Sequence, residues 1–183
     1  MSQLGIVKYS YLAFLSQPAS DRPIYRELRQ HPVRRIVELG VGSAIRAQRV
    51  IQMLLSLDPL AEIHYTGIDL FESRPQQWPG QTLKAAHTMF RRLPARVQLI
   101  PGDPFTALVR WANDLTRTDL LLVARDQDAD AMKRAWAFVP RMLHEGSLVF
   151  HERCSGGQAC FERLGLADVQ RLADAPRQKR SAA

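Results

Sequence analysis

Short apolar runs alternate with longer amphipathic stretches along most of this chain. The runs are rich in β-branched residues and several end on an acid, as expected for strands buried in a parallel sheet. The predicted strands cover residues 35–38, 63–69, 97–100, 119–123 and 147–150. The intervening stretches predict helices over 47–57, 81–92, 105–113 and 128–143. This alternation predicts a Rossmann-like three-layer α/β sandwich around a mostly parallel sheet of about six strands.

The two ends of the chain predict different structure. Residues 1–32 predict a helical preface, and 33–153 the Rossmann-like core. Residues 154–183 predict a helix at 158–164, a short strand at 168–172 and a tail. The 183 residues contain no repeat and fit a single domain of roughly 100–200 residues.

The most informative segment joins the first predicted strand to the following helix, Glu38-Leu39-Gly40-Val41-Gly42-Ser43-Ala44. Glycines at such a turn allow a tight bend and a close approach to a ligand. A dinucleotide fingerprint would place its third glycine at position 45, where Ile45 stands. The spacing therefore favours an acid followed by G-x-G-x-G, with Ala44 as the last small residue, over a nicotinamide-binding turn.

Through this motif the chain resembles the class I S-adenosylmethionine (SAM)-dependent methyltransferases. The resemblance implies SAM as the cofactor, bound outside the carboxyl ends of the strands. Gly40, Gly42 and Ala44, with the amides of the next helix, would hold the methionine carboxylate. Glu38 would contact the amino group.

Further cofactor contacts are predicted where the second and third strands end. Asp69 would accept bonds from two ribose hydroxyls, and Asp103 would receive the adenine amino group, as is typical of the family. Phe71 and Phe105 could stack on adenine. Each residue also has a structural interpretation: Asp69 and Asp103 as turn residues, Glu38 as a surface charge, and the phenylalanines as core.

The fourth and fifth strands end at the predicted acceptor site. This half resembles the small-molecule O-methyltransferase branch, whose metal-dependent members carry a D-G-D-H-like run. Asp126 and Gln127 align with its second acid and histidine, but Ala124 replaces the first acid, so no metal is predicted. His151 is the first candidate base because histidine titrates near neutral pH, and Asp126 and Glu152 follow. A strand-end histidine without catalytic function remains the alternative for His151.

The C-terminal edge of the sheet is predicted to be truncated. Members of the family usually end with an antiparallel hairpin of two further strands, and only some thirty residues follow Glu152. Short predicted lids favour a small or exposed acceptor.

Charge and composition bound the partners. The net charge of +7 comes mostly from scattered arginines, and the interleaved aromatics of a single-strand binding platform are missing, so nucleic acid is an unlikely partner. There is no apolar run of about 18 residues and no signal-peptide pattern, which predicts a cytoplasmic protein that does not span a membrane. The two cysteines form neither a zinc pattern nor a disulfide framework.

These observations predict a SAM-dependent methyltransferase that acts on a small molecule, at oxygen and without a metal. A catalytically degenerate SAM-binding interaction module is the first alternative, and a nucleic-acid-binding protein the second. The oligomeric state is not determined by the sequence.

Overall fold

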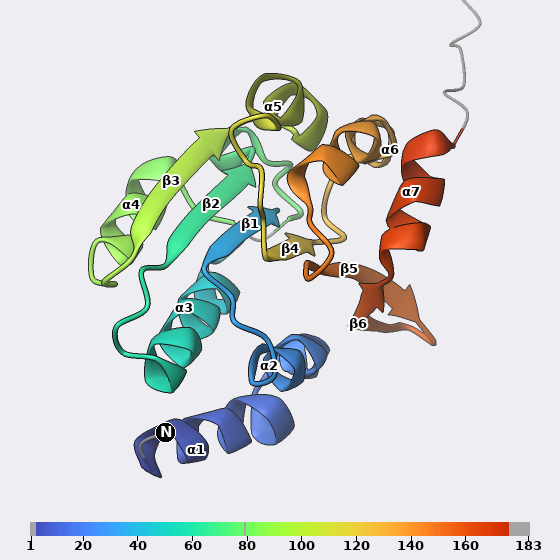
Figure 1. Ribbon diagram of the computed structural model, residues 1–183. Coiled ribbons are helices and arrows are strands. Elements are labelled where there is room, and N and C mark those ends of the chain that lie inside the picture. The colour runs from blue at the N-terminus through green and yellow to red at the C-terminus, as the bar shows by residue number, and fades with distance from the viewer. Residues whose placement is uncertain (1–2, 79, 176–183) are drawn as a thin grey trace, which may run out of the picture.

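A six-stranded sheet forms the centre of the computed structural model, which describes residues 3–78 and 80–175 (Figure 1). The strands are β1 (Arg35–Leu39), β2 (His64–Asp69), β3 (Arg96–Pro101), β4 (Leu120–Val123), β5 (Leu148–Ser155) and β6 (Gln158–Leu164). Their order is β3-β2-β1-β4-β5-β6, and all neighbours are parallel except β5 and β6. The order changes direction between β1 and β4, and ligands of such sheets bind outside the strand ends at this switch point. The predicted Rossmann-like α/β fold is confirmed.

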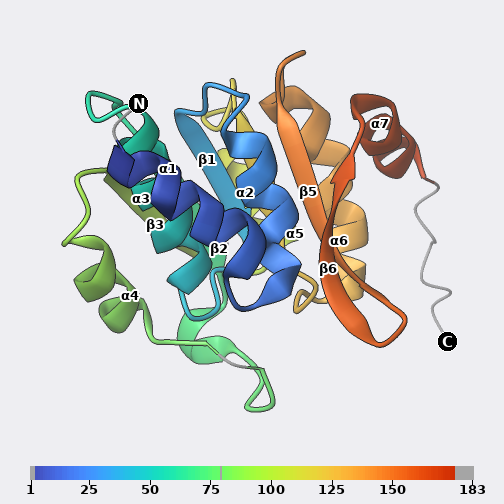
Figure 2. The same cartoon turned by 90° about the horizontal axis from the view of Figure 1, so that it is seen from below.

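Helices cover both faces of the sheet (Figure 2). On one face pack α3 (Ile45–Leu57) and α4 (Leu83–Phe90), and on the other α5 (Pro104–Trp111), α6 (Ala129–Ala135) and η4 (Trp136–Met142). Strand residues alternate between these two cores, as the pleat requires: Ile36 and Leu122 face the α3 side, while Val37 and Val123 face the α5 side. The core strands and helices lie close to their predicted bounds.

The residues before β1 are helical and lie on the α3 side of the sheet. They form α1 (Gln3–Ser10), the π-helical η1 (Tyr11–Leu15), the 3-10 turn η2 (Ala19–Asp21) and α2 (Arg22–Leu28). Both η2 and α2 contact β6, so the beginning of the chain covers the far edge of the sheet. Asp21, at the end of η2, lies 3.8 Å from Arg46 of α3.

The prediction for the C-terminal region was wrong in both of its elements. Residues 158–164 form strand β6, which pairs antiparallel with β5, and the predicted strand at 168–172 lies within helix α7 (Leu166–Asp174). Gly156 and Gly157 make the connection with φ of 58° and 80°, as two-residue hairpin turns require. The sheet therefore ends in the β5–β6 hairpin, and within the described residues one strand, not two, follows β5, so its edge is shortened as predicted. The predicted tail from residue 176 onward lies outside the described residues.

No helix in residues 3–78 and 80–175 combines the length and the apolar character needed to cross a bilayer.

Candidate functional site

The turn after β1 has the left-handed backbone that its sequence suggests. Gly40, Gly42 and Ala44 have φ of 94°, 56° and 60°. Glycine adopts such angles without steric cost, whereas Ala44 costs roughly 1–2 kcal/mol there. The Gly40 amide donates to the Ile68 carbonyl at 2.8 Å, which fixes the turn against the end of β2.

Asp69 joins this turn to the segment after β2. Its Oδ2 accepts the Gly42 amide at 2.9 Å, and its Oδ1 accepts the Phe71 amide at 2.9 Å. Only 2% of its surface is exposed. The carboxylate lies at the tips of two adjacent strands, where the resemblance places the ribose.

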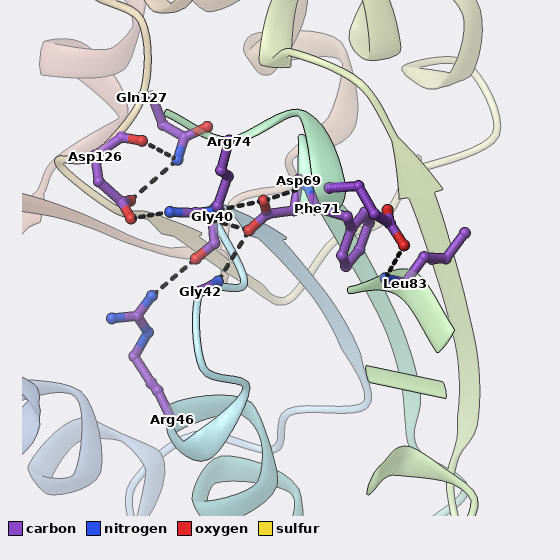
Figure 3. Close-up of polar contacts among 10 residues, drawn as sticks. Gly40, Gly42, Arg46, Asp69, Phe71, Arg74, Leu83, Asp126 and Gln127 are labelled. Carbon is purple, nitrogen blue, oxygen red and sulfur yellow. Dashed lines mark hydrogen bonds and ion pairs between the residues drawn. The ribbon is translucent and has the colours of Figure 1, made fainter. Parts of the chain in front are cut away.

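Arg74, which the sequence did not indicate as a site residue, binds the Asp69 carboxylate (Figure 3). Arg74 donates from Nε to Asp69 Oδ1 at 2.5 Å and from Nη2 to Asp69 Oδ2 at 2.6 Å. Its Nη1 pairs with the Asp126 carboxylate. Burial raises the pKa of Asp69. The bonds from Arg74 and from the Gly42 and Phe71 amides lower it by more, so the pKa lies below its usual value. Asp69 is therefore ionised at neutral pH.

Gly40 lies so close to the loop after β4 that a residue with a side chain could not replace it. A Cβ built there would lie 2.7 Å from the Ala124 Cβ and closer still to Gln127 Nε2. Gln127 Nε2 also donates to Asp126 Oδ1 at 3.1 Å. The space that glycine opens at this turn is thus filled by the chain itself.

Glu38 lies below the turn in an enclosed ionic cluster. It is fully buried, and its Oε1 and Oε2 accept bonds from Arg46 Nε at 2.7 Å and Tyr65 Oη at 2.5 Å. Arg46 also donates to the Gly40 carbonyl at 3.0 Å and lies 3.8 Å from Asp21. Burial raises the pKa of Glu38, and the bonds from Arg46 and Tyr65 only partly offset this. The surface-charge interpretation of Glu38 was wrong, and its contact with the methionine amino group stays a prediction.

The residues predicted to meet adenine have protein partners. Asp103 Oδ1 accepts the Thr106 amide at 3.0 Å and caps α5, as its structural interpretation predicted. Phe71 is 4% exposed and packs in the core. The Arg134 guanidinium covers one face of Phe105, 3.5 Å from the ring centroid. Contacts of these three residues with adenine stay predictions.

The predicted acceptor residues follow two adjacent strands. Asp126 lies in the loop after β4 and pairs with Arg74, whereas His151 lies on β5, opposite Val123 of β4. The His151 ring packs edge-on against Trp136, with centroids 5.5 Å apart. Burial and then the charge of Arg153 lower the pKa of His151 below its usual value.

The other candidates at this end differ in their surroundings. Glu152 points to the opposite face of the sheet from His151 and accepts the Arg125 amide at 3.1 Å.

Within the part of the chain that the structure describes, no three His, Cys, Asp or Glu side chains gather as a metal site would require. Ala124 packs beside Gly40.

The residues that sequence reasoning missed are Arg46, Tyr65 and Arg74. Arg46 could have been suspected, because it follows the glycine turn within the first turn of α3. Arg74 carried no comparable signal, because one partner, Asp69, lies five residues before it and the other, Asp126, lies 52 residues after it.

Comparison with known proteins gives similarity of fold alone. No protein-family model matches the chain, and no curated protein sequence is similar to it. Among solved structures, a SAM-dependent methyltransferase from Clostridium acetobutylicum has a TM-score of 0.47 and 18% identity, over 82% of this chain and 56% of that one. The methyltransferase PaMTH1 of Podospora anserina, solved with S-adenosylhomocysteine (SAH), has a TM-score of 0.47 and 16% identity, over 82% of this chain and 62% of that one.

MnmC2 from Aquifex aeolicus is similar at a TM-score of 0.47 and 13% identity, over 68% of this chain and 44% of that one. The chain thus spans less than two thirds of each of these three proteins. Its Rossmann-like fold is established by its own strand order and register. The strand-tip site is the basis of the function proposed below.

Proposed function

We propose that this chain binds SAM at the tips of β1 and β2 and methylates a small molecule, at oxygen and without a metal. The observation that supports this most is the junction between the left-handed glycine turn and Asp69. The Gly42 amide donates to the Asp69 carboxylate. A glycine turn that a ligand can approach closely therefore lies next to an ionised acid, beside the switch point of the sheet. These are the groups that an amino-acid tail and a ribose require.

The cofactor-binding residues would divide the ligand between them. Asp69 would accept the two ribose hydroxyls, and the amides that open α3 would face the carboxylate of the tail. The fit concerns the backbone and the carboxylate, because the Arg74 and Gln127 side chains occupy the space next to them. Bound SAM would supply a methyl group on a sulfonium cation.

The acceptor's proton requires a base. His151 suits this role because its lowered pKa keeps the imidazole neutral near pH 7. Asp126 is a weaker candidate while it is paired with Arg74. Replacing His151 with Asn should lower the methyl-transfer rate about a hundredfold and leave SAH affinity unchanged. An unchanged rate would exclude His151 as the base.

Titration calorimetry with SAM, SAH and NAD⁺ tests the binding proposal. We expect SAM and SAH to bind to one site and NAD⁺ to give no heat. Absence of binding by both SAM and SAH would refute the proposal, and tighter binding of NAD⁺ would replace it with a dinucleotide site.

A second function is favoured by one observation. The Arg74 side chain binds Asp69 and the Gln127 side chain lies against Gly40, as expected for a catalytically degenerate SAM-binding module with an interaction role. Transfer of labelled methyl from SAM to a panel of hydroxylated small molecules separates the two functions. Labelled product supports the enzyme, whereas SAM binding without any product supports the degenerate module.

A further inference from the structure

We propose that Arg74 is an internal competitor of the cofactor: its guanidinium occupies the Asp69 carboxylate, and the ribose can bind only after Arg74 moves away. This inference rests on the proposed function, since it concerns the same strand-tip site. It assigns to Arg74 control of cofactor affinity.

The hydrogen-bonding capacity of Asp69 is the first support. An ionised carboxylate offers about four acceptor positions. Four bonds already reach Asp69, from the Gly42 and Phe71 amides and from Nε and Nη2 of Arg74. No position remains for a ribose hydroxyl while Arg74 is in place.

The nature of the four donors indicates which one can leave. The Gly42 and Phe71 amides belong to the backbone and hold the turn and the β2 end in position. Arg74 is a long side chain on the segment that follows η3 (Phe71–Ser73). Its two bonds to Asp69 are the pair that ribose hydroxyls would replace.

Asp126 gives the displaced guanidinium a partner. Its carboxylate, 22% exposed, pairs with Arg74 Nη1, on the side of the guanidinium away from Asp69 (Figure 3). Rotation about this contact can release Asp69 without leaving Arg74 as an unpaired charge. Arg46 differs in that Glu38, the Gly40 carbonyl and the buried Asp21 together hold it.

Competition of this kind has a measurable consequence. The apparent affinity of a ligand falls by the fraction of molecules in the binding-competent state. Removal of the guanidinium should therefore tighten cofactor binding, whereas loss of a cofactor-binding residue would weaken it. The sign of the change distinguishes the two roles.

The test is calorimetric titration of SAH into the wild type, Arg74→Ala and the control Arg92→Ala. Arg92 is exposed and follows α4, near the start of β3. We expect Arg74→Ala to bind SAH at least about tenfold more tightly than the wild type, and Arg92→Ala to match the wild type. Equal affinity of the wild type and Arg74→Ala would overturn the inference and leave the proposed function intact, as would weaker binding by Arg74→Ala.

The same titration distinguishes failure of the proposed function from failure of the variant to fold. If none of the three proteins binds SAH, the proposed function fails, and the inference fails with it. If circular dichroism shows that Arg74→Ala does not fold, Arg74→Lys serves instead, because lysine keeps the charge but cannot form the two-pronged contact. It should also bind SAH more tightly than the wild type, by a smaller factor, and unchanged or weaker binding would overturn the inference.

Discussion

Two arginine–carboxylate pairs lie at neighbouring strand tips, and they differ in what surrounds them. Arg46 and Glu38 are enclosed between β1, β2 and α3, and the Arg46 guanidinium lies 4.7 Å from the Phe161 ring centroid on β6. Arg74 and Asp69 lie at the end of β2, and Arg74 also pairs with Asp126, whose carboxylate is 22% exposed. We assign the first pair to the scaffold and propose the second as part of the ligand site.

The comparison shows that a buried acid at a strand tip is not by itself evidence for a ligand. Glu38 and Asp69 have almost equal exposure, 0% and 2%. Their pKa values move in opposite directions, because burial dominates at Glu38 while the bonds from Arg74 and the backbone amides prevail at Asp69. The surroundings, and not the burial, therefore separate the two roles.

The largest expected effect is on stability at the enclosed pair. Replacing Arg46 with Met leaves Glu38 buried without its cation and should lower the free energy of unfolding by about 3–5 kcal/mol. Arg74→Met should cost less, about 2 kcal/mol, because Asp69 retains two backbone amides. Urea denaturation measures both, and equal losses would contradict the distinction between the scaffold pair and the proposed ligand site.

The next effect concerns cofactor affinity. Asp69→Ala should weaken SAH binding by about 2 kcal/mol, roughly thirtyfold, because two hydroxyl bonds to a charged acceptor are lost. Glu38→Gln should change it by less than about threefold, since both Glu38 oxygens already have protein partners. A comparable loss in Glu38→Gln, measured by calorimetry, would instead support the predicted contact with the methionine amino group.

The opposite pKa shifts predict opposite pH dependences. The Asp69 contribution is present above its unfolded pKa, near 3.8, and is lost as the pH falls through its lower folded value. The Glu38 contribution is present below its unfolded pKa, near 4.5, and is lost as the pH rises through its higher folded value.

Unfolding free energies measured from pH 3 to pH 7 test this contrast. Each group changes the slope by at most about 1.4 kcal/mol per pH unit. Asp69→Asn should reduce the loss of stability at the acidic end. Glu38→Gln should reduce the decline above pH 4.5, although Asp21, whose pKa burial also raises, contributes in the same direction. Identical profiles for the two variants would show that the carboxylates do not differ.

The smallest effect is expected at Asp103. As the cap of α5 it should contribute about 1 kcal/mol to the free energy of unfolding, which Asp103→Ala removes. Its effect on SAH affinity decides whether it has a second role. Loss of stability with unchanged affinity would leave Asp103 as a cap, whereas a severalfold weaker affinity would support the adenine contact.

The fold was largely predictable because its signals are local. Apolar runs and glycine or proline breaks identified the five parallel strands and the helices between them. The predicted helix at 158–164 concealed the hairpin, although Gly156-Gly157 has the sequence of a tight two-residue turn. Helix α7 was missed although Leu166, Val169 and Leu172 recur at helical spacing.

The site was only partly predictable, because its contacts link distant parts of the chain. The strand-tip position of Asp69 follows from where β2 ends. No local pattern shows that Arg74 bridges Asp69 and Asp126, since this depends on the path of the segment after η3. For the same reason, the enclosure of Glu38 by Arg46 and Tyr65 emerged only from the three-dimensional arrangement.

A crystal structure of the wild-type protein with SAH tests the central claim most directly. We predict the ribose hydroxyls on the Asp69 carboxylate, with the Arg74 guanidinium moved away from Asp69. SAH bound at another place, with Arg74 still on Asp69, would contradict the claim.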